Sequence, residues 1–100
     1  MSINPKMIMQ MQNRIAKIQQ ELAETVIEGT AGGGVVTVQV SGAKEFLGIK
    51  IDPSAVDPDD VELLEDIITV AVKDAMSRAQ ATSEEKLGVL TAGLNIPGLM

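Results

Sequence analysis

The fold is decided by residues 29–52, which read GTAGGGVVTVQVSGAKEFLGIKID. In the middle of this stretch Val36, Val38 and Val40 alternate with polar residues, which is the period-two pattern of a strand with one buried face. Three glycines, Gly32–Gly34, come before that strand. Because glycine tolerates positive φ, they predict a tight turn between two strands.

A second turn is predicted over residues 41–44, Ser-Gly-Ala-Lys, and a further strand follows it. In that strand Leu47, Ile49 and Ile51 are expected on one side. The three predicted strands cover approximately residues 25–30, 35–41 and 46–51. Two consecutive hairpins form a three-stranded antiparallel meander, and such a sheet needs another layer on its apolar face.

Upstream of the sheet, a helix is predicted over residues 5–24. Asn4 is a suitable cap, and Pro5 fits the first helical position, where no amide donor is needed. Apolar residues then recur at spacings of three and four and form a narrow seam for another helix, either the second helix of the chain or a twin helix of another subunit. The seam consists of Ile8, Met11, Ile15, Ile18 and Leu22.

Downstream of the sheet, a second helix is predicted over residues 58–91. Asp57 is the expected cap, Pro58 the expected first residue and Gly93 the expected terminator. The helix has a broad apolar face, which suits a helix that covers the sheet and still leaves area for a second subunit. The predicted fold class is therefore α+β, with an α-β-β-β-α protomer.

The length of 100 residues fits one small domain, predicted over residues 1–94, followed by a tail over residues 95–100. A chain of this size buries only a modest fraction of its surface alone, so a partner subunit is expected. The sequence has no cysteine, no apolar run long enough to span a membrane and no signal-peptide pattern. It is expected to be a soluble, cytoplasmic protein.

The formal net charge is −6, but the charges are unevenly distributed. Residues 1–20 contain Lys6, Arg14 and Lys17 and no acidic residue. An acidic block lies at residues 57–66; it consists of Asp57, Asp59, Asp60, Glu62, Glu65 and Asp66. Much of this block is explained locally, because acidic side chains at the start of a helix interact favourably with its dipole.

Several other sites are disfavoured. The glycine cluster joins strand to strand and lacks the GK[ST] of a phosphate-binding loop, and the acidic block lacks the spacing of an EF-hand. Met7, Met9 and Met11 are interpreted as flexible packing rather than as a metal or cofactor site. With no histidine or cysteine, the usual base and nucleophile pairs are missing, so no enzyme, cofactor or metal is predicted.

Four segments in order carry a resemblance to a known family: the Met/Gln-rich first helix, GTAGGGVVTVQVSG, IKIDPSAVDPDDVELLEDIITVAVKDAM and LTAGLNIPGLM. Along nearly its whole length the chain resembles the YbaB/EbfC nucleoid-associated protein family. The resemblance implies an α-β-β-β-α homodimer with projecting helices, shaped like tweezers. It also implies DNA binding with limited sequence preference and a role in nucleoid organisation or gene regulation.

The implied function is physically reasonable, because a first helix about 30 Å long would hold its cations beyond the Debye length from the acidic block. The chain returns along the second helix, which is expected to bring Arg78 and Lys86 toward the same end. The candidate DNA contacts are Lys6, Gln10, Gln12, Asn13, Arg14, Lys17, Arg78 and Lys86.

Two alternatives remain open. The polar face of the first helix would also serve as an ordinary solvated face. The acidic composition of the whole protein is also compatible with a dimeric adaptor that binds a protein partner instead of DNA. The sequence predicts that reversing the charges of Lys6, Arg14 and Lys17 abolishes function only if the ligand is DNA.

Overall fold

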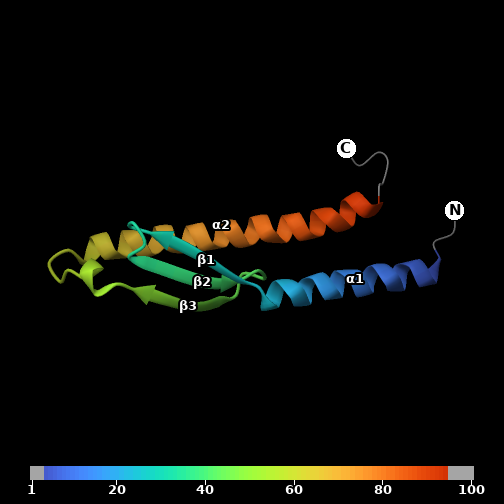
Figure 1. Cartoon of the computed structure of the whole chain (residues 1–100), viewed down its shortest axis with the longest axis horizontal. Helices are drawn as coiled ribbons and strands as arrows, with labels where there is room; N and C mark the ends of the chain where they lie inside the picture. Colours follow the sequence, from blue (N-terminus) through green and yellow to red (C-terminus); the bar gives the residue numbers. More distant parts are fainter. Residues whose placement is uncertain (1–3, 95–100) are drawn as a thin grey trace.

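The chain folds into two long helices with a three-stranded sheet between them in sequence, in a body 68 Å long (Figure 1). The computed structural model describes residues 4–94. Its elements are α1 (Pro5–Glu24), β1 (Val26–Ala31), β2 (Val36–Ser41), β3 (Phe46–Ile51), the short 3-10 helix η1 (Pro53–Ala55) and α2 (Val61–Leu94). The strands pair antiparallel in the order β1-β2-β3, which confirms the predicted α+β class and meander.

Both turns of the meander use backbone conformations in the left-handed region. Gly32, Gly33 and Gly34 have φ values of 66°, 75° and 95°, as expected of a turn made by glycine. In the second turn the left-handed residue is Lys44, with φ of 68°. The hydroxyl of the buried Ser41 accepts hydrogen bonds from the amides of Ala43 and Glu45, which helps to hold this less favourable turn.

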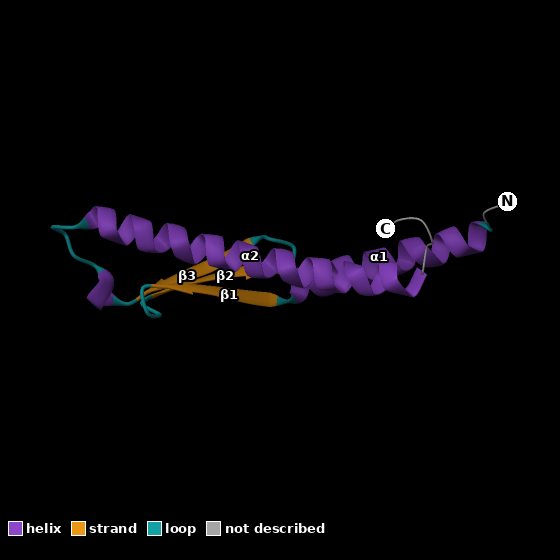
Figure 2. Cartoon of the chain, turned by 90° about the horizontal axis from the view of Figure 1, so that it is seen from above, coloured by secondary structure: helices purple, strands orange, loops and turns teal. Residues whose placement is uncertain are grey.

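The core lies between the inner face of the sheet and the first half of α2 (Figure 2). Val36, Val38 and Val40 are fully buried there, as their alternation predicts. Opposite them α2 presents the small residues Ala71, Ala75 and Ala79, which are also fully buried. Small side chains let the helix approach the strands closely, so packing depends on shape as well as on apolar area.

The closest approach is at Gly29 of β1. A Cβ added to Gly29 would lie 2.2 Å from the backbone nitrogen of Ala75 and 2.6 Å from the carbonyl oxygen of Ala71. Because both atoms belong to the helix backbone, no side-chain rotation could make room for it. Gly29 therefore fixes how closely β1 and α2 pack.

The strand β3 differs from the simple prediction. Ile49 and Ile51 pair with Val38 and Val36, so they lie on the core side of the sheet, but the register shifts between Gln39 and Val40. Leu47 is the extra residue at this β-bulge and has no partner across the ladder, so the expected alternation stops there. The described core residues come from β1, the turn that follows it, β2 and α2, and none come from β3, which leaves the apolar side of β3 uncovered.

The start of α2 corrects the predicted helix boundary. The carboxylate of Asp57 accepts from the amide of Asp59 and caps a turn, whereas that of Asp60 accepts from the amide of Leu63. The cap is therefore Asp60, and α2 begins at Val61 instead of residue 58. Gly93 lies inside α2, so the prediction that it ends the helix is also wrong. The predicted tail, residues 95–100, lies outside the described residues.

The helix α1 is capped as predicted, with the side chain of Asn4 accepting from the amide of Lys6 and Pro5 in the first position. Burial of its apolar seam decreases toward the N-terminus: Leu22 is buried, Ile18, Ile15 and Met11 are half-buried, and Ile8 is 43% exposed. Leu22 sits against Gly42, where an added Cβ would lie 2.8 Å from the Leu22 carbonyl oxygen. The C-terminal end of α1 is therefore anchored to the sheet, and its other end forms a projecting arm.

Candidate nucleic-acid interface

The exposed polar face of α1 carries a row of cations, Lys6, Arg14 and Lys17, with Gln10 and Asn13 between them. Their spacings of eight and three residues place them on neighbouring lines along one side of a helix. All five side chains are exposed. Among the described residues, none of the three cations makes an ion pair. We call this set the cation stripe.

The surroundings of the cation stripe favour an anion. No acidic residue occurs in residues 4–20, so the positive charge is not neutralised within this part of the helix. The acidic block of residues 57–66 lies at the opposite end of the 68 Å body (Figure 1). Exposed charges interact weakly beyond a Debye length of about 8–10 Å, so the distant carboxylates barely weaken the local field.

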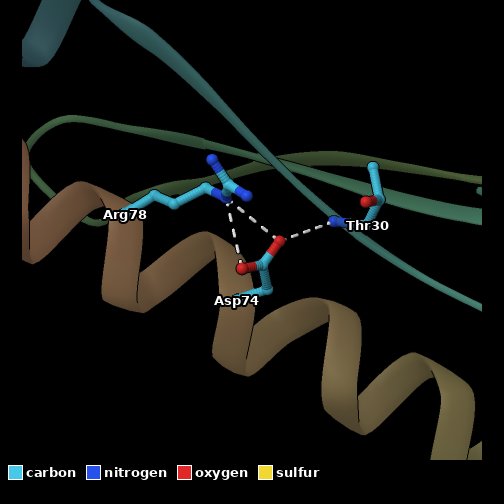
Figure 3. A network of polar contacts seen from close by, with 3 residues as sticks. All are labelled: Thr30, Asp74 and Arg78. Atoms are coloured by element: carbon cyan, nitrogen blue, oxygen red, sulfur yellow. Dashed lines mark hydrogen bonds and ion pairs between the residues drawn. The ribbon is translucent and has the colours of Figure 1, made fainter.

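Arg78 lies apart from the cation stripe, contrary to the prediction. Its Nε donates to the carboxylate of Asp74 at 3.1 and 3.2 Å, and the amide of Thr30 on β1 donates to the same carboxylate at 3.0 Å (Figure 3). The hydrogen bond from the Thr30 amide, followed by that from Arg78, holds the pKa of Asp74 below its usual range. This network joins the free edge of β1 to α2, which gives Arg78 a structural role.

Lys86 is also paired. Its Nζ lies 3.6 Å from the carboxylate of Glu21, near the C-terminal end of α1. Arg78 precedes Lys86 by eight residues, or ~12 Å of helix, in the direction of the sheet. The structure therefore brings Lys86 to the base of the arm and leaves Arg78 over the sheet, so neither joins Lys6 near the start of α1.

The methionines of α1 are the feature that sequence reasoning missed. Met7 and Met9 are 63% and 62% exposed, so they do not serve as packing within the chain. Only Met11 is half-buried, as the helical seam predicts. The position of Met9, on the side of the helix away from the seam, already implies that it points outward. Met7 lies one turn before Met11 of the seam, so its exposure does not follow from the helical pattern alone.

Two other kinds of site find no support in the described part of the chain. No group of three or more carboxylates there is arranged to hold a metal ion. No helix within residues 4–94 is long and apolar enough to cross a membrane.

Comparisons with known proteins agree over nearly the whole chain. A family model described as the YbaB/EbfC DNA-binding family matches residues 2–94. A nucleoid-associated protein of Chloroflexus aurantiacus is 51% identical over 89 residues, which cover 89% of this chain and 89% of that protein. A nucleoid-associated protein of Agrobacterium fabrum is 50% identical over 90 residues, which cover 90% of this chain and 84% of the relative.

A solved structure supports the fold. The crystal structure of the uncharacterized protein HP0035 from Helicobacter pylori matches with a TM-score of 0.71. The match covers 94% of this chain and 100% of that chain, at 19% sequence identity. At this identity the likeness concerns the α+β fold alone.

Proposed function

Because the chain belongs to the YbaB/EbfC DNA-binding family, we propose that it binds duplex DNA as a homodimer, mainly through phosphate contacts with limited sequence preference. Its role would be nucleoid organisation or gene regulation, in the cytoplasm at the nucleoid. The observation that carries the proposal is the cation stripe, three cations on an exposed arm that make no ion pair among the described residues and have no acid within residues 4–20. Gln10 and Asn13 add hydrogen-bond donors along the same face.

The composition of the arm favours duplex over single-stranded DNA. Single-strand binders stack bases on aromatic side chains, and the only aromatic residue of the chain is Phe46. Phe46 lies at the start of β3, on the sheet and not on the arm. Cations without a stacking platform bind the phosphate backbone, which carries little sequence information.

The uncovered side of β3 supports the homodimer. Phe46, Ile49 and Ile51 are 59%, 40% and 37% exposed although each is opposite a fully buried valine of β2. The apolar layer of the core thus continues onto a strand that α2 does not reach, and β3 is also a free edge of the sheet. A second copy packed on this face, with its long axis parallel, would cover it and point both arms in one direction.

The dimer face predicts the effect of a buried charge. Ile49→Glu is expected to give a monomer, because a dimer would bury an unpaired carboxylate in its apolar interface. The measurement is light scattering after size exclusion, with circular dichroism to verify the fold. Val26→Glu is the matched control, since Val26 is 58% exposed on β1 and should leave the dimer intact. A dimeric Ile49→Glu variant would place the interface elsewhere.

The test of DNA binding is a salt series with a labelled duplex. Three cations from each of two protomers give a dimer six phosphate contacts, so the log–log slope of affinity against salt is expected near −5, at about 0.9 per contact. A weak or absent salt dependence would contradict phosphate binding. The label belongs on the DNA, because the chain has no tryptophan or tyrosine.

A second candidate function is an acidic adaptor that binds a basic protein. The observation in its favour is the net charge of −6 and the exposed acidic block at the far end of the molecule. Under this alternative the duplex is not bound even at low salt, because the ligand is a protein. The same salt series therefore decides between the two functions.

A further inference from the structure

The tip of α1, residues 5–12, extends past the end of α2 (Figure 1, Figure 2). Lys86 of α2 lies beside Glu21 of α1, and α2 continues only to Leu94. These last eight residues span ~12 Å, so α2 ends level with the middle of α1. Within residues 4–94, no other helix or strand lies beside the tip, and Met7 and Met9 are exposed there.

Exposed methionines stand on both sides of the cation stripe at this tip. With 3.6 residues per turn, Met7 and Met9 project about 80° to either side of the line through Lys6, Gln10 and Lys17. Met7 also lines a shallow hollow of about 200 Å³ together with Gln10, Met11 and Arg14. A phosphate held by Arg14 would therefore bring the adjoining sugar and base against the Met7 thioether.

We propose that Met7 and Met9, one on each side of the cation stripe, are apolar wedges that each enter a DNA base step when the cation stripe holds the backbone, so that the protein kinks the duplex it binds. This inference rests on the proposed DNA binding and adds its structural consequence. Methionine suits the role because its side chain is unbranched and adaptable. Apolar side chains, methionine among them, partly unstack base steps in proteins that bend DNA by roughly 20–90°.

The charge of the tip favours DNA over a second copy of the arm as its occupant. A twin α1 packed on Met7 and Met9 would bring a second set of Lys6, Arg14 and Lys17 close to the first, with no carboxylate in residues 4–20 to separate them. Like charges held together in an interface are unfavourable. DNA is a polyanion with apolar base faces, so its phosphates can bind the cations while its bases contact the methionines.

The test is a short duplex labelled at its two ends, in which a kink raises energy transfer between the labels. The wild-type protein is expected to raise the transfer at saturation. The double variant Met7→Ala/Met9→Ala is expected to bind with an unchanged salt slope and an affinity within about tenfold, but without the rise in transfer. Folding should not suffer, because alanine has the higher helix propensity.

Two further variants make the outcome specific. Met7→Leu/Met9→Leu keeps apolar side chains of similar size and should retain the kink, and Val70→Ala, which shortens a residue 55% exposed on α2, should behave as wild type. Wild-type binding without any change in transfer, or an alanine variant that still kinks the duplex, would overturn the wedge while leaving DNA binding intact. If the wild-type protein does not bind the duplex, both the wedge and the proposed DNA binding are overturned, and the salt series identifies this outcome.

Discussion

Gly29→Ala is expected to lower the midpoint of thermal unfolding by roughly 15 °C or more. The added Cβ would lie 2.2 Å from the backbone nitrogen of Ala75, so β1 and α2 must move apart over the whole core. Overpacking costs about 1–3 kcal/mol where side chains yield, and a clash with helix backbone should exceed ~3 kcal/mol. In a domain of this size each kcal/mol corresponds to about 4–8 °C. Far-ultraviolet circular dichroism measures the change.

The matched control is the same substitution at Gly88. This glycine lies in α2, and a Cβ added there meets nothing within 4 Å. Since alanine favours a helix over glycine by about 1 kcal/mol, Gly88→Ala should keep or raise the midpoint. If both variants unfold at the wild-type temperature, the close contact between β1 and α2 does not limit stability.

Charge reversal on the arm has the largest expected effect on function. Lys6→Glu/Lys17→Glu removes four phosphate contacts from the proposed dimer. At about 0.9 counterions per contact this lowers affinity about 4,000-fold at roughly 0.1 M salt and reduces the salt slope by about four. The measurement is duplex binding across the salt series, with dichroism and light scattering to confirm fold and dimer.

The control for this variant has the same change in net charge at other positions. Lys50→Glu/Lys73→Glu reverses two exposed lysines, one on β3 and one on α2, away from the cation stripe. It should lose far less affinity, because only distant, screened charges change. An equal loss in both variants would mean that overall charge, and not the arm, governs binding.

The sequence predicts the local features of this fold well, because their causes are local. The glycine turn follows from φ preferences at three positions, and the burial of Val36, Val38 and Val40 follows from alternation. The cap of α2 was misplaced because Asp57 and Asp60 are both suitable caps. Only the chain geometry after η1 decides between them.

The remaining features depend on contacts between distant parts of the chain. The role of Gly29 arises from Ala75, 46 residues away, and no local pattern marks it. The pairing of Lys86 with Glu21 requires the offset between two antiparallel helices. The ion pair of Arg78 with Asp74 is predictable from the sequence, since an acid and a base four residues apart on a helix commonly pair.

The separation of charge along the molecule affects what a coated chromosome presents to its surroundings. In the proposed complex both arms face the duplex, and the acidic blocks at the other end of each protomer point outward. On a stretch of DNA covered by such dimers, the outer surface would carry carboxylates instead of phosphates, so its charge would remain negative. Covered stretches would then repel one another at close range, so the protein would keep neighbouring DNA segments apart instead of bridging them.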